Sequence, residues 1–410
     1  MVPAEPGARR AAALLILLAL ASGARPAHAA DPIEVATVAQ LRAALDAANA
    51  TGGNRSILLA DGTYTLTDTL YVNAPGITLA GRSGDRRRVV LQGDAMSATA
   101  QVGNVIRVAA KNFGLRDLTV QRSRWHLVQI AGESDADGAW LRDCILRDSF
   151  EQMVKVSVDP ARPDVTADGG RVENCLFEYT AGVGPQGYVG GIDALGARDW
   201  VVRGNTFRGI ASPGGGIAQF AVHFWAGSAH ALVERNTVSD CDRGIGFGLD
   251  GRGNRGGVIR NNMIHHSGAG LYGDVGIALI DSPDSAVYNN TVFLGHAYPA
   301  AIEYRFPGTV NVLIANNLLN RAVQRRDGAA ARGLQANLGS AESAWFRDPA
   351  RADLHLLRAV PGVVDAATTL PELIDDFDGE PRPVGRGPDI GADEFAPPRT
   401  PGPPTNVRTQ

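Results

Sequence analysis

The sequence predicts an all-β fold made of stacked repeats, and three observations lead to this prediction. A short motif, represented by Val-Val-Arg-Gly-Asn-Thr-Phe at residues 201–207, recurs along the chain. The position of its Asn falls at residues 118, 144, 175, 205, 236, 262, 290 and 317, in steps of 26 to 31 residues, which is typical of a repeat architecture. Each repeat also contains three short strand-like segments. The connections between them suit a coil of constant handedness better than hairpins, so we predict a right-handed parallel β-helix.

Residues 1–29 have the pattern of a secretory signal peptide. Arg9-Arg10 forms a basic region, residues 11–21 are apolar, and Ala27-His28-Ala29 matches an A-x-A cleavage site. The apolar run is too short to cross a bilayer. We therefore expect a protein that is secreted or periplasmic and has no membrane span.

The mature chain is expected to begin with a short capping helix over residues 37–50. Thr37 can cap its start, and Gly52-Gly53 can end it. Its apolar face consists of Val38, Leu41, Ala44, Leu45 and Ala48. Such a helix suits the end of a solenoid, which needs a cover. Short strands are predicted next, at residues 57–59, 64–72, 77–79 and 89–91.

The repeat around Asn205 illustrates the predicted coil. Strands at residues 192–195, 200–203 and 206–208 are followed by a loop at 209–219, which leads to the next coil. Stacked coils place the repeated Asn side chains above one another, so that each amide can donate a hydrogen bond to its neighbour. Asn also tolerates the left-handed backbone that such a corner requires. The Asn column is therefore predicted to be structural.

The coils are predicted to end near residue 325. The following segment has a late strand at residues 353–357 and forms an irregular C-terminal cap. We expect residues 30–395 to be a single β-helix domain that includes both caps, and residues 396–410 to be a Pro-rich tail or linker.

The repeats, the entry helix and the closing sequence Asp-Ile-Gly-Ala-Asp-Glu-Phe at residues 389–395 resemble those of exported bacterial right-handed β-helix proteins of the pectate-lyase-like superfamily. The resemblance covers nearly all of the mature chain. It implies activity on, or binding of, a carbohydrate polymer, because the superfamily includes polysaccharide lyases, hydrolases, epimerases and proteins without a known reaction. The function itself must be argued from the site.

The first strand of each coil is predicted to form the functional face. Loops of variable length at residues 178–190, 209–219 and 265–274 all precede this strand, and such loops usually wall a binding face. Alternation along the strands predicts one outward column at Gln129, Lys155, Asp193, His223, Gly246, Ala278 and Glu303. A second outward column is predicted at Ala131, Ser157, Leu195, Trp225, Gly248, Ile280 and Arg305.

These columns contain the candidate site residues. Lys155, Asp193 and His223 lie on successive coils and would span ~10 Å, which is one or two sugar units. Trp225 is predicted to hold a sugar ring, and the glycines of the next coil are expected to leave its backbone bare for substrate. The remaining predicted substrate contacts are Asp242, Gly246, Gly248, Glu303 and Arg305.

A lyase that cleaves an acidic polysaccharide by β-elimination is the leading functional prediction. Such an enzyme needs a cation to neutralise the sugar carboxylate and a base to remove the adjacent proton. Lys155 or Arg243 would neutralise the carboxylate, and His223, oriented by Asp193, would be the base. The alternatives are a non-catalytic carbohydrate-binding or cell-surface protein, and a glycoside hydrolase or uronate epimerase. For a hydrolase, Asp193 and Glu303 are too far apart at ~19 Å.

Other interpretations of these polar residues stay open. Lys155, Asp193 and His223 can also form a solvated charge stack without function. Ca²⁺ is the candidate cofactor, with Asp193 or Asp242 as its ligand. No segment has the residue spacing of a zinc site. The remaining histidines that the sequence singles out are interpreted as surface or packing residues, namely His126, His230, His265 and His266.

The net charge of the mature chain limits the kinds of partner that it is expected to bind. Removal of residues 1–29 leaves 36 basic and 42 acidic residues, a net charge of −6, which disfavours nucleic acid and anionic membranes as partners. We expect a monomer that acts on a polysaccharide.

Cys144 and Cys175 share a repeat position and would lie ~5 Å apart. Both a disulfide and a pair of buried thiols fit that distance, and Cys241 is expected to be buried.

Overall fold

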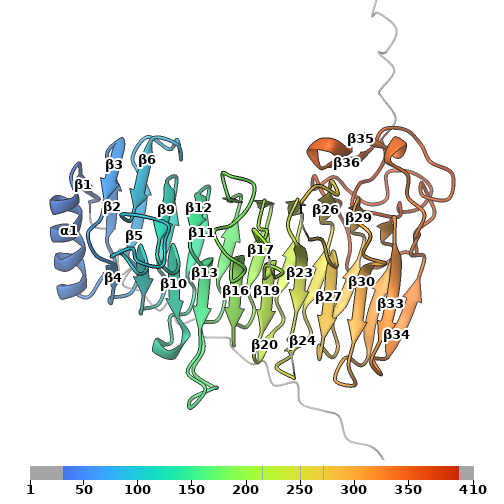
Figure 1. Cartoon of the computed structure of the whole chain (residues 1–410), viewed down its shortest axis with the longest axis horizontal. Helices are drawn as coiled ribbons and strands as arrows, with labels where there is room; N and C mark the ends of the chain where they lie inside the picture. The colour runs from blue at the N-terminus through green and yellow to red at the C-terminus, as the bar shows by residue number, and fades with distance from the viewer. Residues whose placement is uncertain (1–30, 215, 250, 271, 397–410) are drawn as a thin grey trace, which may run out of the picture.

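The computed structural model describes residues 31–214, 216–249, 251–270 and 272–396. In this part, most strands belong to three long parallel sheets of 12, 10 and 10 strands, wound as a right-handed β-helix (Figure 1). The predicted fold class is therefore confirmed. The predicted signal peptide, and all but the first residue of the predicted tail, lie outside the described residues. Within them, no helix has the length and apolar character needed to cross a membrane.

Helix α1 (Val38–Ala50) covers the N-terminal end of the coils, as predicted (Figure 1). Thr37 caps it by accepting a hydrogen bond from the Gln40 backbone N–H. Its buried face consists of Leu41, Ala44, Leu45 and Ala48. One expectation nearby is wrong. The segment 64–72 forms two strands in different sheets rather than one, because the chain turns a corner between residues 65 and 70.

Each complete coil contributes one strand to each sheet, and the strands stack with their neighbours in register. The first sheet, which precedes the Asn turn, consists of β1 (Ile33–Val35), β2 (Ser56–Leu59), β5 (Thr78–Gly81), β8 (Gly114–Arg116), β11 (Trp140–Arg142), β14 (Arg171–Glu173), β17 (Val201–Arg203), β21 (Leu232–Glu234), β25 (Val258–Arg260), β28 (Ala286–Tyr288), β31 (Val312–Ala315) and β34 (Ala331–Gln335). The third sheet, which follows that turn, consists of β3 (Gly62–Thr65), β6 (Val89–Gln92), β9 (Thr119–Ser123), β12 (Ile145–Ser149), β15 (Leu176–Glu178), β18 (Thr206–Arg208), β22 (Thr237–Ser239), β26 (Met263–His266), β29 (Thr291–Leu294) and β32 (Leu318–Leu319).

The second sheet contains the strands predicted to form the functional face. They are β4 (Leu70–Val72), β7 (Ile106–Val108), β10 (Val128–Ala131), β13 (Gln152–Ser157), β16 (Gly190–Leu195), β19 (Phe220–Trp225), β23 (Arg243–Phe247), β27 (Ile277–Ile280), β30 (Ala300–Arg305) and β33 (Ala322–Arg326). Two short pairs complete the strands of the described residues, β20 (Ser228–Ala229) with β24 (Asn254–Arg255) and β35 (Phe346–Asp348) with β36 (Asp353–Leu356). Single 3-10 turns occur at Gly132–Ser134, Ser343–Trp345 and Pro349–Arg351.

The repeated Asn side chains form a continuous run of hydrogen bonds inside the coils. Each amide donates to the side-chain oxygen of the next, over distances of 2.8 to 3.0 Å, through Asn205, Asn236, Asn262, Asn290, Asn317 and Asn337. The left-handed backbone lies one residue earlier than expected, at Gly204, Arg235, Asn261, Asn289 and Asn316. The Asn of the column therefore satisfies buried backbone groups, and the residue before it makes the turn.

The two cysteines at the Asn position of earlier coils are buried thiols rather than a disulfide. The Cys144 backbone N–H lies 3.5 Å from the sulfur of Cys175, so these side chains continue the stack upstream of Asn205. Cys241 is also buried and free.

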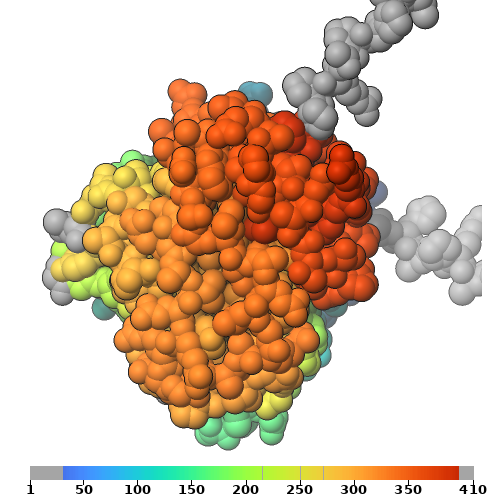
Figure 2. Space-filling view, turned by 90° about the vertical axis from the view of Figure 1, so that its right-hand side faces the viewer, coloured from blue at the N-terminus to red at the C-terminus, as the bar shows by residue number. Residues whose placement is uncertain are grey.

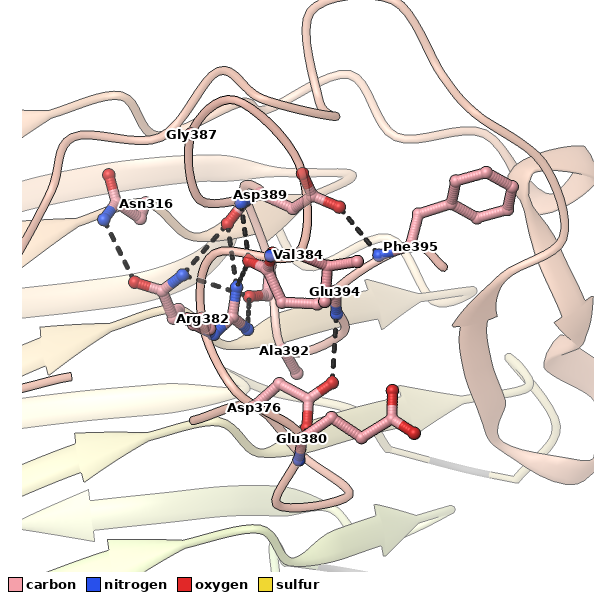
Figure 3. A network of polar contacts seen from close by, with 12 residues as sticks. Asn316, Asp376, Glu380, Arg382, Val384, Gly387, Asp389, Ala392, Glu394 and Phe395 are labelled. Carbon is pink, nitrogen blue, oxygen red and sulfur yellow. Dashed lines mark hydrogen bonds and ion pairs between the residues drawn. The ribbon is translucent and has the colours of Figure 1, made fainter. Parts of the chain in front are cut away.

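The C-terminal segment folds back along the side of the last coils as well as following them in sequence. In Figure 1 it lies above β26 and β29, and Figure 2 shows its red residues gathered on one side of the C-terminal end. Asn261, Asn289 and Asn316, which make the left-handed turns, donate to carbonyl oxygens of Asp375, Asp389 and Thr368 at 2.9, 3.0 and 2.8 Å. The buried Arg382–Glu394 ion pair holds the segment together (Figure 3).

Candidate functional site

The structure brings Lys155, Asp193 and His223 together in the predicted register. The three residues are direct partners across β13, β16 and β19. Lys155 forms an ion pair with one carboxylate oxygen of Asp193. The other oxygen accepts a hydrogen bond of 2.6 Å from Trp225 Nε1 and lies 3.6 Å from His223 Nδ1. The column is thus a contact network rather than a row of independent surface charges.

This network is closed to solvent, which contradicts the expectation of an open face. The side chains of Lys155, Asp193 and His223 are 13%, 4% and 0% exposed. The rings of Phe220 and Trp225 lie 4.9 and 5.4 Å from the His223 ring and cover it. Burial lowers the pKa of His223, and its Nε2 is 3.1 Å from the Gly248 carbonyl oxygen. Neither ring nitrogen therefore faces a space that a sugar can occupy.

The glycines of the next coil do not leave bare backbone for substrate, so this expectation is also wrong. A Cβ atom at Gly246 would lie 2.6 Å from the Phe220 ring, because that ring covers the strand there. At Gly248 a Cβ atom would lie 1.7 Å from the Ile280 carbonyl oxygen, and the φ angle is +78°. Both positions need glycine for close packing within the protein.

The other predicted contacts of the second sheet are held in ion pairs. Arg243 Nε lies 3.1 Å from Asp274 and packs over the Phe220 ring. Glu303 accepts a hydrogen bond of 2.6 Å from Tyr298 and pairs with Arg326 at 3.0 Å. Arg305 pairs with Asp327 at 2.8 Å. Their roles toward a substrate remain predictions.

A cavity of about 540 Å³ lies where the three variable loops meet, at the ends of β18, β22 and β26. We call it the three-loop cavity. Its lining is Gly182, Val183, Arg208, Gly209, Ala211, Ser212, Pro213, Asp240, Asp242, His266, Ser267, Ala269, Gly270 and Tyr272. The loops thus enclose a space, as their variable lengths predict, but beside the third sheet and not over the Lys155 column.

Two carboxylates line the three-loop cavity, and their surroundings shift their pKa values in opposite directions. Asp242 is 2% exposed, and this burial raises its pKa although its Oδ2 accepts hydrogen bonds of 2.8 Å from the Ser212 and Ala218 backbone. At Asp240 burial also raises the pKa, but hydrogen bonds from Ser267 at 2.7 and 2.8 Å and nearby histidines lower it below its usual value. Two carboxyl groups whose pKa values are moved in opposite directions are suited to the roles of an acid and an ionised partner.

His266 and Tyr272 complete the polar part of this cavity. Burial lowers the pKa of His266, whose Nδ1 accepts a hydrogen bond of 3.0 Å from the Gly268 backbone. Its ring meets the His296 ring edge to face at 4.7 Å. Of these cavity residues only Asp242 was predicted from the sequence to contact substrate; His266 was interpreted as a surface or packing residue, and Asp240 and Tyr272 were missed. The adjacent His265 and His266 next to a variable loop were the available signal. Both are buried, with His265 stacked on Phe293, and of the two only His266 lines the cavity.

Comparison with known proteins agrees with the architecture. A family described as the right-handed β-helix region matches residues 109–340. The chain belongs to this family. Among solved structures, this β-helix protein is similar to pectate lyase Pel9A, with 12% identity, a TM-score of 0.50, and coverage of 86% of this chain and 91% of that one. A search of curated sequences finds no match.

Other solved β-helix structures show similar coverage. An alginate lyase from Paenibacillus sp. str. FPU-7 is 14% identical with a TM-score of 0.45, over 74% of this chain and 98% of that one. PfbA, a surface adhesin of Streptococcus pneumoniae, is 10% identical with a TM-score of 0.43, over 75% and 91%. At these identities the similarity of this β-helix protein to them concerns the fold.

The predicted calcium ligands do not fit a cation at Asp193. Lys155 occupies one of its oxygens and Trp225 the other. Asp242 uses one oxygen to accept two backbone N–H groups. Within the described part of this β-helix protein, neither residue belongs to a group of three His, Cys, Asp or Glu ligand atoms that lie close together. We therefore derive no catalytic step that uses Ca²⁺.

Proposed function

We propose that this protein binds a neutral polysaccharide in the three-loop cavity and hydrolyses it by acid–base catalysis. The observation that carries the proposal is the pair Asp240 and Asp242, which line one cavity while their surroundings move their pKa values apart. Asp242 would keep a proton and donate it to the glycosidic oxygen, and Asp240 would be the ionised partner.

Both carboxyl groups line the same cavity, from the segment that follows β22. Carboxyl pairs in glycoside hydrolases are separated by ~5 to 9.5 Å, depending on whether water attacks directly. Asp240 holds Ser267 through one oxygen and Asp242 holds the 212–218 loop through one oxygen, so each has a second oxygen for the substrate.

The cavity favours a neutral sugar over an acidic one. Asp240 is ionised near neutral pH, and the cationic Arg208 is already paired with Glu178. A uronate in the cavity would therefore meet a like charge without a free cation. The Tyr272 side chain, 38% exposed at the cavity, offers an aromatic surface for a sugar ring.

β-Elimination of an acidic polysaccharide remains the second candidate, and the contact between Lys155, Asp193 and His223 favours it. In this reaction Lys155 or Arg243 would neutralise the sugar carboxylate, and His223 would remove the proton. Phe220 and Trp225 would first have to move away from the imidazole. A third outcome, in the place of either reaction, is polysaccharide binding without cleavage.

Product analysis separates these candidates. The full mature chain is incubated with neutral and acidic polysaccharides, and reducing ends and ultraviolet-absorbing unsaturated ends are measured. We expect reducing ends without unsaturation, and a loss of about 10²-fold or more in rate for Asp242→Asn, which still accepts the two backbone hydrogen bonds. Asp284→Asn, at a turn outside the cavity, is the control and should retain full activity. Unsaturated ends, or binding without cleavage, would refute hydrolysis.

A further inference from the structure

Three segments of the C-terminal region bring their metal-binding side chains together, away from the three-loop cavity. His355 lies on β36, Asp378 on the loop after residue 375, and Asp393 in the closing sequence. One ligand atom from each lies within 4.8 Å of the other two, and within the described residues this is the single such group. Separations of 23 and 15 residues along the chain explain why residue spacing did not reveal it.

The imidazole of His355 is oriented as metal-binding histidines usually are. Its Nδ1 lies 2.5 Å from Asp353 Oδ1, so that a carboxylate fixes the ring from one side. Its Nε2 points toward Asp378, at 3.0 Å from Oδ2. A histidine that binds a metal through one nitrogen generally donates the other N–H to such a carboxylate, which fixes the tautomer and orients the ring.

Asp393 has one carboxylate oxygen available to a cation at this cluster. The residue is 5% exposed, and its Oδ2 accepts a hydrogen bond of 2.7 Å from the Leu356 backbone. Its other oxygen receives no hydrogen bond from any described residue. This oxygen is therefore free to bind a cation at the cluster.

We propose that His355, Asp378 and Asp393 bind a Zn²⁺ ion that fastens the C-terminal segment. An imidazole with two carboxylates suits zinc better than calcium, which prefers six or more oxygen ligands. Ligands around tetrahedral zinc lie about 3.4 Å apart, given bonds of about 2.1 Å. Asp378, with a side chain 49% exposed, has the freedom to close the remaining distance.

The ion would reinforce contacts that already join three parts of the segment, such as the hydrogen bonds from Leu356 to Asp393 and from Glu394 to Asp376. β36, the turn at residues 376–380 and the closing residues 389–395 would share one bound ion. The closing residues in turn hold the coils, since the Ala392 backbone donates to Thr291 at 2.9 Å and Asn289 donates to the Asp389 carbonyl. Zinc binding would therefore stabilise the packing of this segment on β29.

Zinc titration of the chelator-treated mature protein tests the proposal. Thermal unfolding is followed with and without ZnCl₂. We expect zinc to raise Tm of the parent protein and to leave Tm unchanged in His355→Ala and Asp378→Asn. Asp378 is exposed, so its variant folds even if the His355 variant does not. His230→Ala removes an exposed histidine that pairs with Asp199 at 3.3 Å, and it should keep the full shift.

Two results would contradict the proposed zinc site. One is a parent protein whose Tm does not respond to zinc, or responds only to Ca²⁺ or Mg²⁺. The other is a zinc response that is the same in Asp378→Asn as in the parent, which would place the ion elsewhere. These outcomes are independent of hydrolysis in the three-loop cavity.

Discussion

The buried carboxylate of Asp193 accepts hydrogen bonds from two donor groups, one on each oxygen. Its carboxylate pairs with Lys155 and accepts the indole N–H of Trp225, with His223 against it. Removing one partner of a buried ion pair leaves the other charge uncompensated, which costs far more than the pair contributes on balance. The Lys155 column is therefore better explained as part of the packing on the second sheet than as an exposed catalytic row.

Loss of the Asp193 carboxylate is expected to destabilise the protein strongly. Asp193→Ala should lower the free energy of unfolding by about 3–5 kcal/mol, because Lys155 loses its counter-charge in a buried site. Urea denaturation measures the change. Glu34→Ala, which breaks the exposed pair with Arg82, should cost about 0–1 kcal/mol. A loss below about 1 kcal/mol for Asp193→Ala would instead indicate an accessible site.

The two carboxylates of the three-loop cavity predict a bell-shaped pH dependence of hydrolysis. The rate should rise with pH as Asp240 ionises, below its ordinary pKa of 3.8, since hydrogen bonds from Ser267 outweigh burial there. It should fall again as Asp242 loses its proton above 3.8, because burial raises that pKa. Initial rates over the pH range in which the protein stays folded provide the measurement. A rate that keeps rising into the alkaline range would contradict this assignment and favour a histidine base.

At the scale of one element, the Asn run shows how a turn stabilises a stack of coils. Asn262 is fully buried and makes hydrogen bonds to Asn290, Val233 and Asn236. In the coil of Asn262 and in the next two coils, the residue before the Asn of the run is also an Asn. This second Asn lies on the outside of the coils and donates a hydrogen bond to the C-terminal segment. The doubled Asn thus joins the interior of the coils to the segment that covers them.

Asn262→Ala should be strongly destabilising. It leaves several buried backbone and amide groups without partners, each worth about 1–3 kcal/mol, so we expect a loss of about 3 kcal/mol or more. Asn337→Ala is the matched control, because that residue ends the run and is partly exposed to water. Denaturation midpoints compare the two variants. Equal losses would show that the run has no special role in the interior.

For the whole molecule, the repeat predicted the architecture because it is a local pattern with a constant period. The strand register and the alignment of Lys155, Asp193 and His223 follow from it, and the structure confirms them. The entry helix, which lies outside the repeats, was predicted from its own apolar spacing and is also confirmed. The C-terminal segment has no repeat, so its path back along the coils depends on contacts such as Asn289 with Asp389 that no sequence period reveals.

The solvent exposure of the side chains on the second sheet was harder to predict than their alignment across its strands. Alternation along β19 correctly places His223 on the face opposite the core residues Val222 and Phe224, but it does not predict which side chains cover that face. The Phe220 and Trp225 rings cover His223, and Phe220 also packs over Gly246. The three-loop cavity was likewise missed, because its carboxylates and His266 come from strand ends whose loops meet only in three dimensions.

A crystal structure of Asp242→Asn with a bound oligosaccharide tests the location of the site most directly. The substrate is taken from the product analysis, and the variant should bind it without cleaving it. We predict that the sugar occupies the three-loop cavity, with a glycosidic oxygen within hydrogen-bond distance of residue 242 and a ring against Tyr272. A sugar bound along the second sheet against Trp225, with Phe220 displaced and Lys155 at its carboxylate, would contradict the account.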